Sequence, residues 1–208
     1  MEGPLFTHGT RLIETFGRDA TGFPRLEAHL ARMAGSACAL GFRFDRPAIE
    51  RALSDVPDTP GLRVRLTTGE AGDAEVTWAP LTTMHTPLRV RFSDTRLSSA
   101  DPRLRHKTTQ RQLYDRIRVG MGGETDEVFF LNERDEICEG TITNLFFDLG
   151  EGLCTPPLSC GCLPGILRAE LLATGQCREA VLRAADLPRA RLWAGNALRG
   201  LMATDHPG

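Results

Sequence analysis

The order of strand-like and helix-like segments constrains the fold of this chain more than any other feature of its sequence. Residues 5–16 have a strand-like pattern, whereas across 25–40 apolar residues recur three or four positions apart, as on one face of a helix. Asp45 and Pro47 then supply the N-cap and the first turn of a second short helix. The two kinds of segment follow one another without the regular alternation of βαβ units, so we expect an α+β fold.

The expected strands fall into two groups. Residues 12–16 are expected to form a hairpin with the segment that starts at Phe23, and further strands are expected at 61–68, 75–79 and 88–92. A β-meander is expected over 127–155, followed by a helix that begins at Pro164. The polar run 93–101 is the expected linker. It gives a smaller N-terminal domain at 1–98 and a larger C-terminal domain at 99–208.

Composition narrows the class of protein. The 208 residues are 41% hydrophobic and carry a formal net charge of −2, which gives no basic surface for nucleic acid. No run of about 18 apolar residues suggests a membrane span, and the N-terminus lacks the pattern of a signal peptide, so we expect a cytoplasmic protein. The six cysteines are expected to be reduced thiols, and their spacing lacks the paired knuckles of structural zinc, so no metal site is expected.

Lys107 is the only lysine among the 25 lysine and arginine residues of the chain. A guanidinium keeps its proton in proteins, whereas a desolvated lysine amine can lose its proton near about pH 7 and attack a carbonyl. Thr109 can cap a helix in which Leu113, Ile117 and Met121 lie four apart. Lys107 is therefore expected where a strand or loop enters a helix, a position that can hold a side chain rigidly in a cleft. The alternative is a surface lysine without a chemical role.

Three further features suit a phosphate-bearing aldehyde cofactor. Glu139 ends an expected strand, and a buried carboxylate can keep a pyridine nitrogen protonated. The loop that ends in Leu163-Pro-Gly runs into a helix, whose free N–H groups favour a phosphate. Arg32 lies on the apolar face of the first expected helix and needs an anionic partner there. Each feature also has an alternative without a cofactor. Glu139 could be a salt-bridged acid in a turn, the loop could be an ordinary helix start, and Arg32 could be a solvated arginine.

Together these segments resemble the fold type IV pyridoxal-phosphate enzymes, the aminotransferase class IV family of branched-chain and D-amino acid aminotransferases and 4-amino-4-deoxychorismate lyases. The matching motifs come in family order: His106-Lys-Thr-Thr-x-Arg-x-x-Tyr-Asp, Glu139-Gly-Thr-Ile-Thr-Asn-Leu and Leu163-Pro-Gly-Ile-Leu-Arg. Leu12-Ile-Glu-Thr and the late Asn196-Ala-Leu-Arg-Gly look most like the lyases. The resemblance covers nearly the whole chain. It implies a two-domain D-amino acid aminotransferase-like fold with pyridoxal 5'-phosphate as cofactor.

The resemblance also implies a role for each matching residue. Lys107 would bind the cofactor covalently, Glu139 would bind its pyridinium nitrogen, and Thr15 would lie near the substrate. The other cofactor contacts would come from Arg32, Ile166, Leu167, Asn196 and Ala197 at the phosphate, Leu163 under the ring and Tyr114 at the phenolic oxygen. Many relatives have threonine in place of Leu167, so one hydroxyl contact with the phosphate would be missing.

The first function that the resemblance implies is a lyase reaction of folate biosynthesis, in which 4-amino-4-deoxychorismate yields p-aminobenzoate and pyruvate. Lys107 would take the C4 proton as general base, and Thr15 would help to protonate the leaving enolpyruvate. One alternative is a class IV aminotransferase that acts on a branched-chain or D-amino acid. A second, suggested by Leu167 and the short N-terminus, is a pyridoxal-phosphate-binding protein without turnover. The family further implies a homodimer and a small-molecule amine as substrate.

Overall fold

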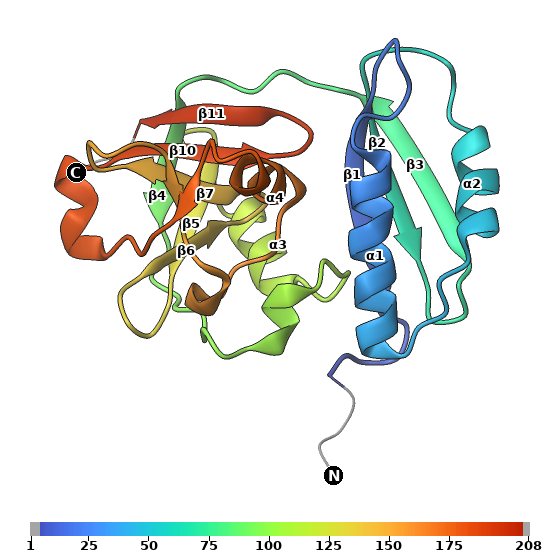
Figure 1. Cartoon of the computed structure of the whole chain (residues 1–208), viewed down its shortest axis with the longest axis horizontal. Helices are drawn as coiled ribbons and strands as arrows, with labels where there is room; N and C mark the ends of the chain where they lie inside the picture. Colours follow the sequence, from blue (N-terminus) through green and yellow to red (C-terminus); the bar gives the residue numbers. More distant parts are fainter. Residues whose placement is uncertain (1–4, 206–208) are drawn as a thin grey trace. The chain divides into compact units, whose positions relative to one another are not determined.

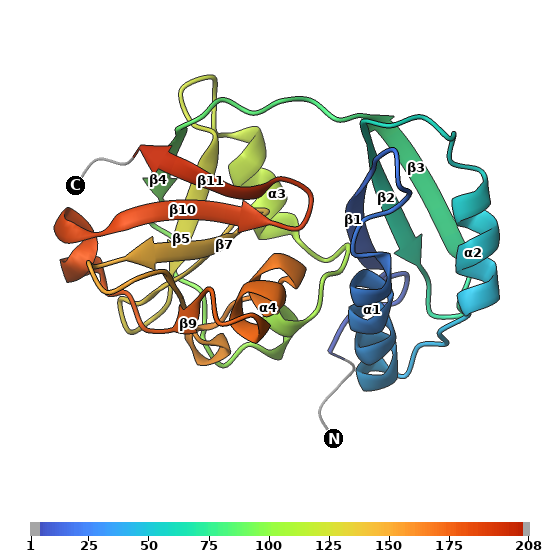
Figure 2. The same cartoon turned by 45° about the horizontal axis from the view of Figure 1, so that its top comes forward.

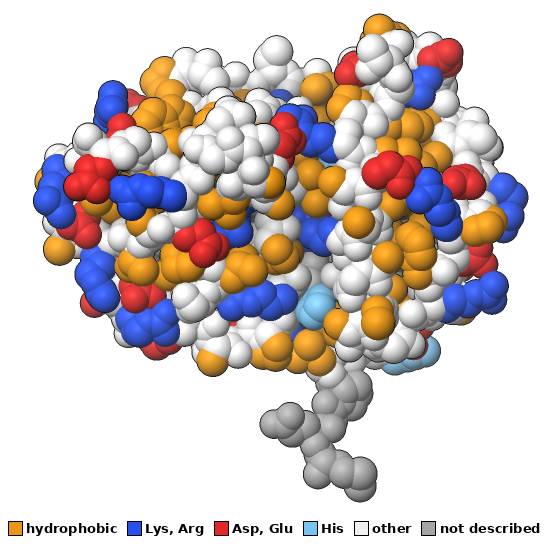
Figure 3. Space-filling view, viewed as in Figure 1, with side chains coloured by type: hydrophobic (Ala, Val, Ile, Leu, Met, Phe, Trp, Pro, Cys, Tyr) orange, Lys and Arg blue, Asp and Glu red, His pale blue; other side chains and the backbone are white. Residues whose placement is uncertain are grey.

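The chain forms two compact units in a computed structural model that describes residues 5–205. Unit 1 comprises the residues up to Thr83 together with His106–Gln110, and unit 2 comprises Met84–Arg105 and the residues from Arg111 onward. None of the helices within residues 5–205 has the length and the apolar character needed to cross a membrane. All six cysteines are free thiols, as predicted. Acidic and basic side chains are interspersed on the face drawn in Figure 3.

Unit 1 is a three-stranded antiparallel sheet with two helices on one face (Figure 1). Its strands, in the order β1-β2-β3, are β1 (Leu12–Arg18), β2 (Leu62–Thr68) and β3 (Ala74–Pro80). Its helices are α1 (Leu26–Leu40) and α2 (Arg46–Ser54). Alternate apolar side chains of β1 and β2 pack against both helices in one core, which contains Leu12, Phe16, Leu30, Met33, Ala37, Ile49, Leu53, Val64 and Leu66.

The local sequence accounts for both helices of unit 1. The α1 helix ends at Gly41, which adopts a φ of 71°, a left-handed conformation that glycine takes without strain. Asp45 caps α2, because its side chain accepts a hydrogen bond from the Ala48 amide at 3.0 Å. Both predicted helices are therefore confirmed, and Asp45 is the predicted N-cap of the second.

Unit 2 is built on an eight-stranded sheet in the order β10-β11-β4-β5-β6-β7-β8-β9. An additional pairing of β10 with β7 closes β10, β11, β4, β5, β6 and β7 into a barrel, and Figure 2 shows β10 between β11 and β7. The strands are β4 (Leu88–Phe92), β5 (Glu127–Leu131), β6 (Ile137–Gly140), β7 (Asn144–Asp148), β8 (Cys154–Thr155), β9 (Arg178–Glu179), β10 (Arg191–Asn196) and β11 (Gly200–Asp205). The helices are α3 (Gln112–Val119), α4 (Ile166–Ala173) and the short 3-10 turns η1 (Pro102–Arg105), η2 (Leu158–Cys160) and η3 (Ala184–Arg189).

Strands β5 and β7 are buried along their whole length because both of their faces are covered. Phe129 and Leu131 of β5 belong to the cluster shared by every barrel strand, whereas Phe130 between them packs against α3. In the same way Phe147 of β7 belongs to the shared cluster and Phe146 packs against α4. This double burial explains why β5 and β7 read as continuous apolar runs rather than as alternating ones.

Two local predictions are wrong. The segment after Phe23 enters the turn before α1 instead of pairing with β1, whose partner is β2, with Leu12 opposite Thr68. Thr109 does not cap α3, since that helix begins at Gln112 and the Thr109 hydroxyl accepts a hydrogen bond from the Arg11 amide at 2.9 Å. In both cases a partner far away in the sequence replaces the local one.

The polar run 93–101, expected as a linker, packs within unit 2. Leu97 is 6% exposed and its amide donates to the Leu131 carbonyl at 2.8 Å, while the Ser99 hydroxyl donates to Glu133 at 2.6 Å. The β4 strand before the run pairs with β5 and β11 of unit 2. The two units therefore differ in their limits from the domains expected at 1–98 and 99–208, and the chain passes from one unit to the other after Thr83, Arg105 and Gln110.

Candidate active site

Lys107 belongs to unit 1, although the residues on both sides of its segment belong to unit 2. Its carbonyl accepts a hydrogen bond from the Ile13 amide at 2.8 Å, and the amide of Thr109 donates to the Arg11 carbonyl at 2.9 Å. Leu12 and Thr108 form an antiparallel bridge between these two bonds. The backbone around Lys107 is therefore fixed to the outer edge of β1, and its half-buried side chain starts from a defined position.

Glu14, a residue that the sequence analysis did not single out, lies on β1 among cations. It is 1% exposed and accepts hydrogen bonds from Arg32 Nε at 2.9 Å and Arg32 Nη2 at 2.6 Å. His29 Nδ1 lies 2.5 Å from Glu14 Oε2, the oxygen that also accepts the bond from Arg32 Nη2. Burial alone would raise the pKa of Glu14, but the charge and hydrogen bonds of Arg32, the hydrogen bond with His29 and the charge of Lys107 lower it below its ordinary value. Unit 1 thus holds a buried carboxylate ion close to its lysine.

A sequence signal for Glu14 was available. In the run Leu12-Ile-Glu-Thr-Phe16, residue 14 falls between two core residues on the same face of the strand, so an acid there requires a buried partner. His29 and Arg32 lie three apart on α1 and both face this acid. Arg32 therefore has the anionic partner that its position predicted, and that partner is Glu14.

Thr15 points to the face of the sheet opposite to Glu14, because neighbouring strand residues alternate between faces. The register of β1 and β2 places Arg65 directly across from Thr15 and places Arg63 across from Gly17. Arg65 is half-buried and Arg63 is exposed. Arg65 is therefore the arginine of β2 that lies beside Thr15.

Glu139 is the central charged group of unit 2. It ends β6, is 6% exposed, and accepts hydrogen bonds from the Tyr114 hydroxyl at 2.6 Å and from the Leu163 amide at 2.8 Å. Burial raises the pKa of Glu139 to about 7, although both hydrogen bonds act in the opposite direction. The structure therefore brings two predicted residues, Tyr114 and Leu163, to the carboxylate of a third, Glu139, whose pKa lies near neutral pH. A perturbed pKa of this kind is common at functional sites.

The turn after Glu139 is held by a second buried acid. Glu127 is 1% exposed and accepts hydrogen bonds from the Thr141 amide at 2.9 Å and from the Thr143 hydroxyl at 2.9 Å. Gly140 passes close to these groups, which leaves no room for a side chain. The short β6–β7 connection is thus fixed on both sides, and Glu139 is fixed with it.

Replacing Gly140 with alanine is expected to lower the free energy of unfolding by about 1–3 kcal/mol, the usual cost of overpacking a buried site. A Cβ at this position would collide with Thr143 Oγ1 and lie 2.8 Å from the carboxyl carbon of Glu127. Denaturation in urea measures the loss. The matched control is Gly123→Ala, because a Cβ there has no described atom within 4 Å. Equal losses in the two variants would contradict this account of the turn.

The start of α4 has no side-chain cap. Gly165, which has no side chain, occupies the N-cap, so the first amides of the helix, including those of Ile166 and Leu167, are not capped by it. Asn144 donates a hydrogen bond from Nδ2 to the Leu163 carbonyl at 2.9 Å and so ties this loop to β7. A helix start of this kind binds anions through its N–H groups and its dipole.

Asn196 and Ala197 form the turn between β10 and β11. The Asn196 Oδ1 accepts hydrogen bonds from the amides of Leu198 at 3.1 Å and Arg199 at 3.0 Å, and its Nδ2 donates to the Ile142 carbonyl at 3.3 Å. The side chain of Asn196 is therefore used to shape its own turn and to attach it to the β6–β7 connection. The predicted residues fall into two sets, with Lys107, Thr15 and Arg32 in unit 1 and the others in unit 2.

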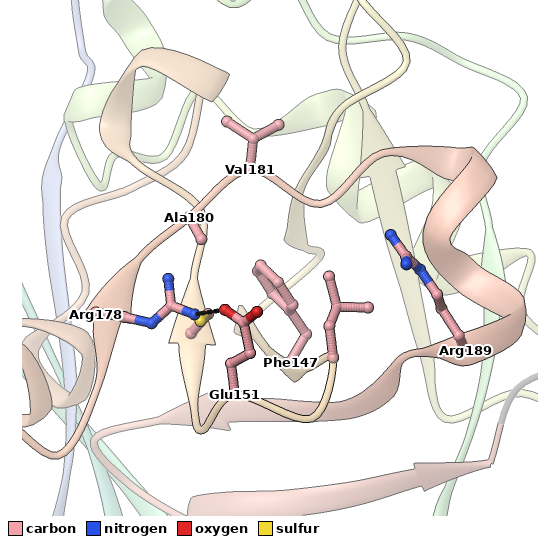
Figure 4. A pocket seen from close by; sticks show the side chains of 8 residues that line it. Phe147, Glu151, Arg178, Ala180, Val181 and Arg189 are labelled. Atoms are coloured by element: carbon pink, nitrogen blue, oxygen red, sulfur yellow. Dashed lines mark hydrogen bonds and ion pairs between the residues drawn. The ribbon is translucent and has the colours of Figure 1, made fainter.

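A pocket elsewhere in unit 2 contains none of these residues. It has a volume of about 230 Å³, an apolar floor that includes Phe147 and Cys154, and a rim where Arg178 pairs with Glu151 at 2.9 Å (Figure 4). Arg189, on another side of it, pairs with Asp186 at 2.5 Å. Among residues 5–205 no cluster of three or more His, Cys, Asp and Glu side chains is arranged to hold a metal ion.

Comparison with known proteins places the chain in a family. Residues 11–205 match the model of the family amino-transferase class IV. The crystal structure of a candidate amino-acid aminotransferase from Mesorhizobium loti is 45% identical, with a TM-score of 0.90 over 95% of this chain and 100% of that chain. A candidate aminodeoxychorismate lyase of Schizosaccharomyces pombe is 31% identical over 177 residues, which cover 82% of this chain and 76% of its own.

A third relative gives the fold alone. The structure of a hypothetical aminotransferase from Mycobacterium tuberculosis in a PLP-bound form has a TM-score of 0.81 at 19% identity, over 95% of this chain and 81% of that chain. The predicted family resemblance and the predicted fold are both confirmed. The class IV aminotransferases and the aminodeoxychorismate lyases are pyridoxal-phosphate-dependent enzymes, and this chain belongs to the amino-transferase class IV family.

Proposed function

We propose that this enzyme is a lyase that converts 4-amino-4-deoxychorismate to p-aminobenzoate and pyruvate. The observation that carries the proposal is the hydrogen bond from the Ile13 amide to the Lys107 carbonyl, 2.8 Å long. It fixes the proposed base against the strand that bears Thr15, the proposed proton donor. The Schizosaccharomyces pombe relative, named as a candidate for the same activity, supports this choice.

The residues present fit pyridoxal 5'-phosphate. Glu139 is a buried carboxylate with donors already on both oxygens, so it is rigid enough to pair with a protonated ring nitrogen, and a carboxylate can accept further bonds. The uncapped start of α4 suits a phosphate group. Lys107 is the only side-chain amine that an aldehyde could meet. We propose that Leu163 packs under the ring and that Arg32 and the Asn196–Ala197 turn assist at the phosphate.

When bound, the cofactor withdraws electrons from the bonds next to the substrate nitrogen, which makes a neighbouring proton acidic. We propose that Lys107 Nζ removes the proton from C4 of the substrate. The ether bond to the enolpyruvate group then breaks, and the ring becomes aromatic as p-aminobenzoate. The Thr15 hydroxyl orients and helps to protonate the leaving enolpyruvate, which becomes pyruvate. Glu139 would pair with the ring nitrogen and keep it protonated when the cofactor is bound.

An aminotransferase is the second candidate. It is favoured by the name of the Mesorhizobium loti relative, a candidate amino-acid aminotransferase at 45% identity. Lys107 would again remove a proton next to the substrate nitrogen, but the product would be a keto acid. A branched-chain or D-amino acid would then be the substrate, with Arg65 beside Thr15 as the carboxylate partner.

The test is product analysis. The purified enzyme with pyridoxal phosphate is supplied with chorismate, glutamine and an aminodeoxychorismate-forming synthase, while pyruvate and p-aminobenzoate are both measured. Formation of the two in equal amounts, and its loss in Lys107→Arg, is the expected result. Thr15→Val should slow pyruvate release and leave cofactor binding unchanged. Release of a keto acid from an amino-acid donor, without release of pyruvate from the first substrate, would establish the aminotransferase. If neither reaction occurs, the protein binds the cofactor without turnover.

We further propose that the enzyme acts as a homodimer in the cytoplasm on a small-molecule amine. The family resemblance supports this assembly. Light scattering after size-exclusion chromatography should then give about twice the chain mass of 22.8 kDa, and a mass equal to one chain would refute the dimer.

A further inference from the structure

Tyr114, the only tyrosine of the chain, does not have the freedom that a cofactor-binding hydroxyl would need. Its ring packs edge-on against Phe130, with centroids 5.1 Å apart, and the Arg111 guanidinium lies over it at 5.5 Å. Its hydroxyl donates to Glu139 Oε1 at 2.6 Å. A hydroxyl has one proton to donate, so a proton given to Glu139 is not available for the phenolic oxygen of a cofactor.

The hydrogen bond from Tyr114 to Glu139 is a strong one. An O–H···O⁻ contact of 2.6 Å is a short, charge-assisted hydrogen bond, and the 6% exposure of Glu139 leaves little water to replace it. The Leu163 amide serves the other carboxylate oxygen at 2.8 Å. These two donors oppose the burial that favours the neutral acid, so the loss of either one shifts Glu139 toward protonation.

We propose that Tyr114 is a positioning residue that acts through Glu139. Its hydroxyl holds the carboxylate ionised and oriented for a protonated ring nitrogen, instead of binding the cofactor itself. The part that concerns the ring nitrogen rests on the proposed function, whereas the pairing of Tyr114 with Glu139 is a property of the chain alone.

The other charged groups around Glu139 are compatible with this role. Arg111 favours the ionised form of Glu139 and Glu127 opposes it. Burial raises the pKa of Cys162 to about 12 and raises that of Cys138 further, so both thiols stay neutral near pH 7. Burial also raises the pKa of Tyr114, so this hydroxyl keeps its proton and remains a donor. Glu139 itself has a pKa of about 7, so its charge changes near neutral pH.

The single tyrosine makes the pairing directly measurable. In full-length protein labelled with ¹³Cζ-tyrosine, the one resonance reports on the Tyr114 hydroxyl. Without added cofactor, the chemical shift is expected to change with pH around a midpoint near 7, the pKa of Glu139. Glu139→Gln should abolish that transition. A resonance that does not titrate, or that titrates equally in Glu139→Gln, would overturn the proposal.

Tyr114→Phe keeps the ring against Phe130 and removes only the donor. In the holoenzyme kcat should fall about ten- to a hundredfold at pH 7, the usual effect of losing a hydrogen bond to a charged group, with KM nearly unchanged. The acidic limb of the pH–kcat profile should move to higher pH, because Glu139 would then bind its proton more tightly. A purely structural tyrosine would lower the midpoint of thermal unfolding and leave this limb in place. If the resonance titrates but the lyase assay fails, the proposed function is wrong and the pairing stands.

Discussion

Glu14→Gln is expected to lower the free energy of unfolding by about 3–5 kcal/mol at neutral pH, the usual loss when one partner of a buried ion pair is removed. Arg32 is 11% exposed in its side chain and bonds to Glu14 through two nitrogen atoms, so the variant removes the charged acceptor of both bonds at a buried position. Urea denaturation monitored by circular dichroism measures the loss. Glu27→Gln, in an exposed pair with Arg46 on the same unit, is the control and should show far less.

The loss of stability in Glu14→Gln is expected to depend on pH. The pKa of Glu14 in the folded protein lies below its ordinary value of 4.5, so its contribution is complete above that pH. As the pH falls through the folded pKa, the carboxylate is protonated and the contribution is lost. The difference in stability between the native protein and Glu14→Gln should therefore shrink in acid. A difference that is constant from neutral to acidic pH would contradict an electrostatic role.

Lys107→Arg is expected to reduce kcat by about 10⁴-fold or more, because a guanidinium keeps its positive charge but neither bonds to an aldehyde nor gives up its proton. Its backbone bonds to β1 do not depend on the side chain, so thermal unfolding should change little. Borohydride treatment with pyridoxal phosphate should attach one cofactor to Lys107 in the native protein and none at this position in the variant, as measured by peptide mass spectrometry. An active Lys107→Arg enzyme would eliminate Lys107 as the base.

Local sequence signals correctly placed the helices and the strands whose partners are close in the sequence. The α1 and α2 helices follow from apolar spacing with a glycine stop and an aspartate cap, and the β5–β8 meander follows from short connections between neighbouring strands. The partner of β1 did not follow, because Leu12 pairs with Thr68, far along the chain. The β11 strand was not predicted, since it is mostly exposed and lacks an apolar period. Non-local pairing is not visible in one sequence.

In the candidate site, too, contacts between distant parts of the chain were not predicted. The sequence made Lys107, Glu139 and Arg32 candidates, since each is an unusual residue for its place. Glu14 was missed, because its meaning depends on which helix face packs against β1. Tyr114 was recognised, but the structure gives its hydroxyl the carboxylate of Glu139 as partner. Residue type thus selected the candidate side chains, whereas their contacts come from tertiary packing.

Unit 1 consists of two separate stretches of the chain, because His106–Gln110 forms backbone hydrogen bonds beside β1. A fragment that ends at Thr83 would lack the segment that covers the outer edge of β1, and an unpaired edge strand invites aggregation. A fragment that starts at Met84 would carry the lysine without the strand that holds it. Attempts to shuffle or separately express the halves should therefore use a permuted chain in which 106–110 is rejoined to the first 83 residues.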